Sequence, residues 1–374
     1  MNHFREIANG WRDQGLKLAL ATVIKVKGSA YRREGAKMLI AEDGRSEGSV
    51  SGGCLESDLI ENAKKVVAEN RPSRHFYDMT ADDDLLWGLG LGCNGAVDVL
   101  LEPLPDDIES VLGDVAVPSA RCVLVQLDGE LPSTVRSMMI QQDGRGEGSL
   151  GDPELERQVR EKALELLDKE RSTTLSFQWS SAGSEHTAEV YIESRIPDTR
   201  FVIFGAGHDA IPLVPLAKKM GWRVQVVDSR PQFAVPQRFP EADQVLHAHA
   251  EDFDGKVPTG PFVYAMVMTH RFQEDMKILK WLAGKEMGYV GVLGPRDRLE
   301  KMLEAARQEG TEISLDQMPF VYNPAGLDIG GDTPEQVALS IVAEIMAVKN
   351  KRRAGFLRDR RGPIHERTHE AAHS

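Results

Sequence analysis

The stretch "RFVIFGAGHDAIPLVPLAKKMGWRVQVVDSR", Arg200 to Arg230, decides the fold of the C-terminal half. It is an apolar strand, a glycine turn, a helix and a second strand that ends in an acid. Gly205 and Gly207 lie at the turn, and Ala210 takes the third small position of a G-x-G-x-x-G/A pattern. Asp228 follows where a carboxylate can bind ribose hydroxyls. The pattern predicts a Rossmann-like parallel sheet. Binding of NAD(P) or another nucleotide stays open, because proteins with this fold do not all bind a nucleotide.

Two later segments supply further candidate binding residues at strand ends. "FVYAMVMTH" ends near Thr269 and His270, and "GYVGVLG" leads to Gly294 and Arg296. Ligands of parallel sheets bind beyond the carboxyl ends of the strands, so we expect these residues to converge with the glycine turn and His208 on one crevice. His270 could equally cap or pack within the fold.

The segment before this domain contains an internal repeat. "KMLIAEDGRSEGSV", Lys37 to Val50, aligns with "SMMIQQDGRGEGSL", Ser137 to Leu150, at an offset of 100 residues. "TVIKV" at 22–26 likewise faces "CVLVQ" at 122–126, and "DVLLE" at 98–102 faces "EVYIE" at 189–193. The sequence of each copy predicts a strand, an Asp-Gly hairpin, a second strand, a helix and further strands. We therefore predict an α/β chain in three parts: a duplicated α+β domain over 1–197, with copies at about 16–104 and 117–197, a Rossmann-like domain over 198–350, and a basic, unstructured tail over 351–374.

Two cysteine loops occur in the first copy alone. "SGGC", Ser51 to Cys54, stands where the second copy has "GDPE", Gly151 to Glu154, an ordinary helix start. "WGLGLGCNG", Trp87 to Gly95, falls where the second copy is nine residues shorter. The loops are therefore not needed to close the repeated fold, which favours a functional role.

Their composition indicates what that role could be. Gly52 and Gly53 leave backbone N–H groups uncovered beside a helix start, which is typical of a site for phosphate or carboxylate. A thiol placed there, Cys54, is expected to have a lowered pKa and to be more nucleophilic. The same reasoning extends to Cys93, which lies between Gly92 and Asn94. The alternative is that both cysteines are small apolar residues in tight turns; neither has zinc-ligand neighbours at the usual spacing.

Composition limits the possible classes of protein. The 374 residues carry a formal net charge of -13, which disfavours binding to nucleic acid or to an anionic membrane. The chain has no apolar run long enough to span a membrane, and its first residues do not resemble a signal peptide. Three cysteines are no disulfide framework and suit a reducing compartment, so we expect a cytoplasmic protein.

Several motifs together resemble one family, the XdhC/CoxI accessory proteins of xanthine dehydrogenase and related molybdenum hydroxylases. The N-terminal part matches through "GSVSGGCLE" and "WGLGLGCNGAVDVLLEPL", and the C-terminal part through "VIFGAGHDA", "VVDSR", "VMTH" and "GLDIGGDTPEQVALSIVAEIMAV". The resemblance implies a chaperone that binds the molybdenum cofactor (molybdopterin), protects it during sulfuration and hands it to an apo xanthine dehydrogenase-type enzyme. It also implies a cysteine desulfurase as a partner, and we expect a homodimer.

The resemblance implies roles for both sets of candidate residues. The phosphate of the cofactor would bind at Ser51 to Cys54 or at the Rossmann turn, and Cys54 or Cys93 would contact the molybdenum. Two alternatives stay open. One is an NAD(P)-dependent oxidoreductase with His208 or His270 as acid/base, and the other is a purely protein-binding scaffold.

Overall fold

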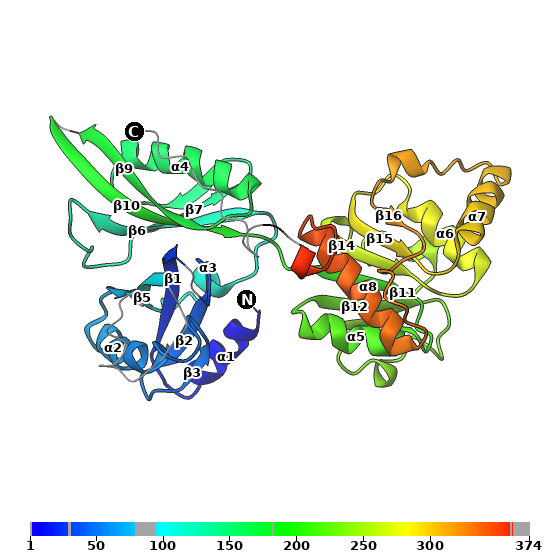
Figure 1. Cartoon of the computed structure of the whole chain (residues 1–374), viewed down its shortest axis with the longest axis horizontal. Helices are drawn as coiled ribbons and strands as arrows, with labels where there is room; N and C mark the ends of the chain where they lie inside the picture. The colour runs from blue at the N-terminus through cyan, green and yellow to red at the C-terminus, as the bar shows by residue number, and fades with distance from the viewer. Residues whose placement is uncertain (1, 29–30, 79–94, 182, 360, 362–374) are drawn as a thin grey trace. The chain divides into compact units, whose positions relative to one another are not determined.

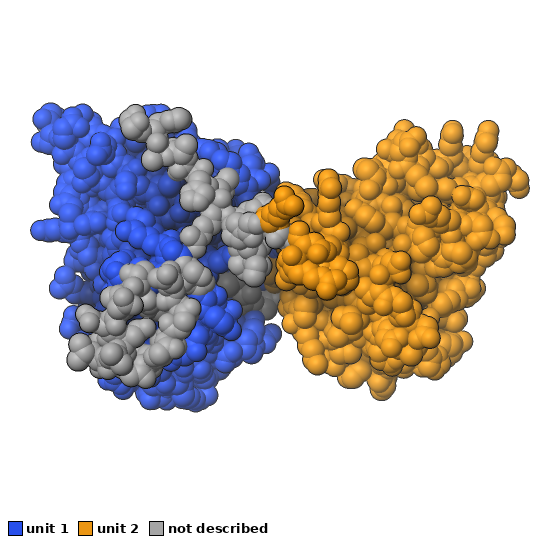
Figure 2. All heavy atoms as spheres, viewed as in Figure 1, with its two compact units in different colours: residues 1–197 blue, residues 198–374 orange. Residues whose placement is uncertain are grey.

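The computed structural model describes residues 2–28, 31–78, 95–181, 183–359 and 361 (Figure 1). The chain divides into two compact units, Met1–Pro197 and Asp198–Ser374, which Figure 2 colours separately. Among the described residues, every helix is too short or too polar to cross a lipid bilayer.

Unit 1 holds two five-stranded antiparallel sheets with the same strand order, β3-β2-β1-β5-β4 and β8-β7-β6-β10-β9. The first copy comprises β1 (Leu18–Gly28), β2 (Lys37–Ala41), β3 (Ser46–Gly48), α2 (Glu56–Glu69), β4 (Ser73–Asp78) and β5 (Gly95–Pro103); α1 (Asn2–Arg12) precedes it, and α3 (Glu109–Leu112) lies between the copies. The second comprises β6 (Ser119–Leu127), β7 (Ser137–Gln141), β8 (Gly146–Gly148), α4 (Pro153–Asp168), β9 (Thr173–Ser181) and β10 (Ser184–Arg195). The two sheets are thus two copies of one pattern.

Strand pairing corrects the alignment of one strand between the copies. Leu18 pairs with Ala41 in the first copy, and Ser119 pairs with Gln141 in the second. Because Ala41 and Gln141 are 100 residues apart, β6 follows β1 by 101 residues, and the β6–β7 connection is one residue shorter. The alignment of "TVIKV" with "CVLVQ" is therefore one residue out. Such a slip exchanges the two faces of a strand, so side chains must be compared in the corrected register.

Each sheet of unit 1 has a helix on one face and the other sheet on part of the other face. Helix α2 packs on the first sheet around Val23 and Val99, and α4 packs on the second around Val190. The inner faces of the two sheets meet in a small apolar cluster: Ile24, Leu100, Val123, Val125 and Tyr191. The repeat therefore folds as two sheet-and-helix copies whose sheets share a small apolar core.

Two buried ion pairs also join the copies. The Arg121 guanidinium donates to both carboxylate oxygens of Glu102, at 2.8 and 2.7 Å. Lys37 donates from the first copy to Glu193 of the second. Glu102 and Glu193 are equivalent positions, 91 residues apart, so the same carboxylate is used twice with different cations.

Unit 2 is a six-stranded parallel sheet in the order β13-β12-β11-β14-β15-β16, which is the Rossmann order 3-2-1-4-5-6. From β11 the chain adds strands toward one edge of the sheet, and from β14 it adds them toward the other edge. Ligands of such folds bind at this switch point, between β11 and β14. The predicted fold class, a duplicated α+β unit followed by a Rossmann-like sheet, is confirmed. The principal elements are β11 (Arg200–Phe204), α5 (Ala210–Lys219), β12 (Arg223–Asp228), β13 (Gln244–His247), β14 (Gly260–Val267), α6 (Phe272–Leu282), β15 (Met287–Val292), α7 (Arg296–Gln308), β16 (Val321–Tyr322) and α8 (Pro334–Lys349).

Candidate functional site

The glycine turn of unit 2 lies at the carboxyl end of β11. Gly205 has a φ of +121°, and a Cβ there would lie 2.5 Å from the carbonyl oxygen of Met268. Only glycine allows this approach of the turn to β14. A Cβ on Gly207 would meet nothing nearer than His270 Cδ2, at 3.9 Å. The structure therefore brings Gly205, Gly207 and His270 together at the switch point of the sheet.

Asp228 ends β12 as expected, but its carboxylate is turned inward. The residue is 3% exposed, and its Oδ2 accepts from the backbone N–H of Ala206 at 2.7 Å. Arg230 donates to both oxygens, at 2.9 and 2.7 Å, and its guanidinium lies 3.8 Å from the Phe233 ring centre. Burial raises the pKa of Asp228, but these hydrogen bonds outweigh burial and lower it. A ribose hydroxyl would have to displace Arg230 from the Asp228 carboxylate. Nucleotide binding through Asp228 stays a prediction.

The strand end after β14 separates two predicted residues into different environments. Thr269 is buried, and its hydroxyl donates to Asp275 Oδ1 at 2.6 Å, so it serves the fold of the turn. His270 is exposed, with a φ of +59°, and its Nε2 lies 2.9 Å from Asp209 Oδ2. His270 and Asp209 thus form a solvent-facing pair beside the glycine turn.

The remaining predicted residues of unit 2 lie at strand ends without a shared partner among the described residues. His208 is exposed in the glycine turn, and Arg296 is exposed at the first position of α7. Gly294 has a φ of +105°, and its carbonyl accepts from Asn323 Nδ2 at 2.8 Å. These contacts do not connect Gly294 or Arg296 to the glycine turn.

In unit 1 the Cys54 loop is organised by Glu56, the first residue of α2. Its carboxylate accepts from the Ser51 hydroxyl at 2.5 Å and from the Ser51 backbone N–H at 2.9 Å. The Ser51 hydroxyl in turn accepts from the N–H groups of Gly53 and Leu55, both at 3.2 Å. Cys54 is half-buried, and its thiol donates to the same hydroxyl at 3.5 Å. One serine side chain therefore gathers the donors of the loop.

The second copy uses the same glutamate for the same purpose. Glu156 accepts from the Ser149 hydroxyl at 2.6 Å and from the Leu150 N–H at 2.8 Å. There Asp152 caps the helix by accepting from the Leu155 N–H at 3.1 Å. The first copy has Gly52 at the position of Asp152, and its helix begins three residues later, at Glu56, without a side-chain capping hydrogen bond. The glutamate is thus common to both copies, whereas the thiol is particular to the first.

This arrangement weighs against an open anion site at Ser51 to Cys54, which stays a prediction. Of the loop's backbone N–H groups, those of Ser51, Gly53 and Leu55 already have acceptors, and one acceptor is the negatively charged Glu56 carboxylate. An incoming phosphate would meet that charge at short range. Gly52 faces the ring of Tyr31, since a Cβ there would lie 3.8 Å from Tyr31 Cγ. The thiol of Cys54, not an anion nest, is the feature left for a ligand.

The second cysteine loop is not among the parts of the chain that the structure describes. Cys93, Gly92 and Asn94 lie outside the described residues. Cys122 is buried in β6, and burial raises its pKa to about 12. Among the described residues, no group of three or more His, Cys, Asp or Glu side chains could hold a metal ion.

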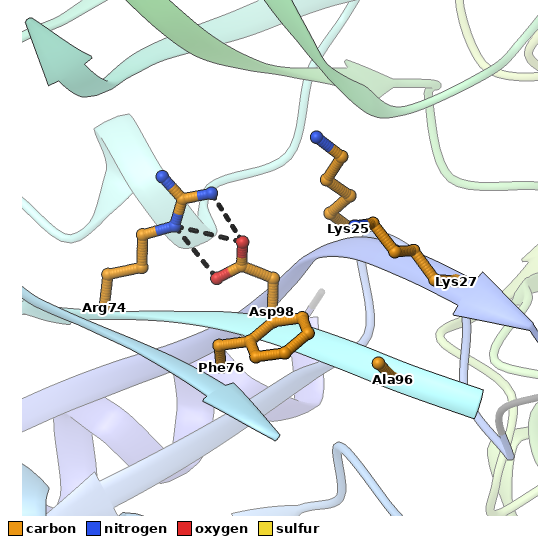
Figure 3. Close-up of a pocket in the computed structure, with 6 residues that line it drawn as sticks. All are labelled: Lys25, Lys27, Arg74, Phe76, Ala96 and Asp98. Carbon is orange, nitrogen blue, oxygen red and sulfur yellow. Dashed lines mark hydrogen bonds and ion pairs between the residues drawn. The ribbon is translucent and has the colours of Figure 1, made fainter. Parts of the chain in front are cut away.

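Sequence comparison missed a basic pocket on the inner face of the first sheet. It is lined by Lys25 and Lys27 on β1, Arg74 and Phe76 on β4, and Asp98 on β5, with Ala96 at its floor (Figure 3). We refer to these six residues as the basic pocket. A comparison of the copies in the corrected register would have found it, because none of its cations or its aromatic ring recurs in the second copy.

Acid is expected to loosen the Cys54 loop through Glu56. Partial burial raises the pKa of Glu56, but hydrogen bonds from Ser51 and Ser49 outweigh it and hold the pKa below the usual 4.5. A lowered pKa stabilises the fold above pH 4.5, and this contribution is lost as the pH falls through the folded-state pKa. Glu56→Gln should cost about 1 kcal/mol at neutral pH and reduce the loss of stability on acidification. Urea unfolding from pH 7 to 3.5 measures both, with the exposed Glu61→Gln as control; an acid dependence equal to that of wild type would contradict the role.

Comparison with known proteins identifies relatives over nearly the whole chain. A model of the XdhC and CoxI family matches residues 11–78 and 116–178, and a model of the XdhC Rossmann domain matches residues 201–345. A protein of Bacillus subtilis (strain 168), named as a probable xanthine dehydrogenase subunit, is 29% identical over 94% of this chain and 99% of its own. "Molybdenum cofactor insertion chaperone PaoD" of Escherichia coli (strain K12) is 23% identical over 90% of this chain and 84% of its own.

A solved structure agrees with both the sequence relatives and the fold. A crystal structure titled as a xanthine dehydrogenase from Bacillus halodurans is 31% identical, covers 93% of this chain and 96% of its own, and superposes with a TM-score of 0.72. Two family models, one for each unit, and a structural relative of this similarity lead to one conclusion: the chain belongs to the XdhC and CoxI family.

Proposed function

We propose that the chain binds the molybdenum cofactor, shields it while its terminal sulfur is installed, and transfers it to an apo molybdenum hydroxylase of the xanthine dehydrogenase type. The observation that carries the proposal is the similarity, over 90% of the chain, to a protein named as a molybdenum cofactor insertion chaperone. The similarity to a probable xanthine dehydrogenase subunit supports the class of client enzyme. A cysteine desulfurase as sulfur donor and a homodimeric assembly belong to the same proposal.

The Cys54 loop fits one part of such a cargo and not another. A half-buried thiol is a soft ligand, suited to molybdenum or to the sulfur-rich end of the cofactor. The loop suits the phosphate less well, because the Glu56 carboxylate accepts from the Ser51 and Leu55 backbone N–H groups and brings a negative charge into the loop. Within this proposal, Cys54 holds the metal end as a thiolate, and the hydrogen bond that its thiol donates to Ser51 positions it before the metal binds.

An NAD(P)-dependent oxidoreductase is the second candidate, supported by the Rossmann strand order and the exposed His270–Asp209 pair. Against it stands the engagement of Asp228 by Arg230, since the acid that would bind ribose is already paired. We therefore place it below the chaperone.

Anaerobic binding of molybdenum cofactor, released from a purified molybdoenzyme, tests the proposal. Wild-type protein should retain the cofactor through gel filtration, and Cys54→Ser should weaken binding by about tenfold or more, as for loss of a metal-contacting group. Cys122→Ala is the matched control, because that thiol is buried in the core of the same unit. Cys93→Ala tests the second thiol in the same assay. Saturable NADH binding without affinity for the cofactor would reject the chaperone in favour of the oxidoreductase.

A further inference from the structure

The basic pocket has the size and chemistry of a ligand site. Its volume is about 330 Å³, within the range of small-molecule pockets. It lies on the inner face of the first sheet, beyond the apolar cluster that joins the two sheets, and three adjacent strands contribute its walls (Figure 3). Rigid strands hold its side chains in place, so no loop has to close to form it.

The charges of the pocket leave two lysines to act on a ligand. Arg74 is fully engaged: its Nε lies 3.0 Å from both Asp98 oxygens, and its Nη1 donates to Glu189 of the second copy at 2.6 Å. Lys25 Nζ is 3.5 Å from Glu189, a loose ion pair. No carboxylate among the described residues pairs with Lys27. Three cations face two carboxylates, so the pocket keeps a positive charge within a chain whose net charge is -13.

An exposed aromatic ring stands at the edge of the pocket. Phe76 is 58% exposed on the edge strand β4, and Lys27 Nζ lies 6.0 Å from its ring centre. An exposed phenylalanine adds nothing to the core, but its face is available for stacking by a planar heterocycle. A flat ring on Phe76 would carry an attached phosphate within reach of the lysines.

The second copy provides an internal comparison. The corrected register places uncharged or acidic residues at the positions of the two lysines, and small polar residues at the positions of the arginine and the ring. The fold therefore needs neither the lysines nor the exposed ring. The four pairs are Lys25 and Gln126, Lys27 and Asp128, Arg74 and Thr174, and Phe76 and Ser176.

We propose that the basic pocket binds the monophosphate of a planar heterocycle, with the ring stacked on Phe76 and the phosphate between Lys25 and Lys27. A phosphate monoester carries nearly two negative charges at neutral pH, and it would be attracted by the excess positive charge of the pocket. Two sources share this chemistry, a pterin phosphate and a mononucleotide. The pterin source rests on the proposed function and would give the cofactor's phosphate the site that the Cys54 loop lacks.

The pocket and the thiol lie at the same end of the first sheet. Tyr31 belongs to the β1–β2 connection, four residues after Lys27, and its ring faces Gly52 in the Cys54 loop. Cys54 packs on the α2 side of that sheet, whereas the basic pocket opens on the inner face, so the two features are separate sites on opposite faces.

The pocket is tested by replacing its residues with those at the equivalent positions of the second copy. Lys27→Asp and Phe76→Ser place residues that the equivalent strands already accept, and Lys301→Asp on α7 repeats the charge change far along the chain. Binding of anaerobically released molybdenum cofactor, of GMP and of CMP is measured by titration calorimetry at two salt concentrations. We expect each pocket variant to raise Kd about tenfold for one ligand class, and added salt to weaken wild-type binding. Lys301→Asp should bind as wild type does, and unchanged thermal midpoints show that the variants are folded.

The outcomes separate this inference from the proposed function. Weaker cofactor binding in both pocket variants supports the pterin source. Binding of a mononucleotide alone, lost in the same variants, supports the pocket while rejecting the chaperone. Cofactor binding that Cys54→Ser abolishes but the pocket variants leave unchanged overturns the pocket and keeps the chaperone. Failure of wild-type protein to bind any of the three probes overturns the pocket as well.

Discussion

Glu102→Gln should destabilise unit 1 by about 3–5 kcal/mol, because it removes the carboxylate that accepts both hydrogen bonds from the buried Arg121 guanidinium. Glu102 is 1% exposed and Arg121 is 5% exposed, so water cannot replace the lost carboxylate. The amide can still accept one hydrogen bond, but it carries no charge to balance the guanidinium. Hydrogen exchange in β5 and β6 should rise, while β11 and β14 of unit 2 serve as an internal reference.

A surface ion pair of the same chemistry is the control. Arg157 donates to Glu161 at 2.7 Å on the solvent-facing side of α4. Glu161→Gln should lower the free energy of unfolding by less than about 0.5 kcal/mol. Replacing Glu102 and Arg121 together by apolar residues should recover most of the loss, because no isolated charge is then buried. A loss below about 1 kcal/mol for Glu102→Gln would show that the two copies do not depend on this pair.

Gly205→Ala should cost unit 2 about 3 kcal/mol or more. A φ of +121° is essentially restricted to glycine, and the added Cβ would lie 2.5 Å from the Met268 carbonyl oxygen, a backbone atom that cannot rotate away. The turn and β14 would have to separate, which breaks the Met268 N–H to Phe204 carbonyl hydrogen bond of 2.8 Å. Calorimetric unfolding should show the transition of unit 2 at lower temperature and that of unit 1 unchanged.

Gly207→Ala is the matched control within the same turn. Its Cβ would meet only the His270 side chain, at 3.9 Å, and its φ is not in the left-handed region. The expected cost is below about 1 kcal/mol. An equal loss of stability at the two positions would mean that the turn shifts to accommodate the Cβ. The close approach of Gly205 to Met268 would then not determine the structure of the turn.

Much of the fold could be predicted because its signals are local. The glycine turn, helix and strand of Arg200 to Arg230 lie within one stretch, and the Asp-Gly hairpins mark the same point in each copy. The strand order of unit 2 is the one typical of the Rossmann fold that this stretch predicts. The offset of β6 could not be predicted, because a strand has a period of two residues and "TVIKV" fits either register by composition.

The candidate sites were harder, because they depend on where side chains point. Arg230 is only two residues from Asp228 in the sequence, but its turn toward that carboxylate depends on packing against Phe233. Glu56 looks like an ordinary acid in a first helical turn, yet its carboxylate folds back onto Ser51. The basic pocket draws on three strands, and no spacing along the chain connects Lys27 with Phe76.

The internal hydrogen bonds of the Cys54 loop have a consequence for binding kinetics. Glu56 and Ser51 give the loop its shape through the protein's own groups, so the thiol is held in position before any ligand arrives. A preformed loop avoids the entropic cost of ordering on association, and its release needs no local refolding. Exchange of a ligand at Cys54 is then governed by access to the thiol, a property suited to a protein that must pick up a cargo and give it away.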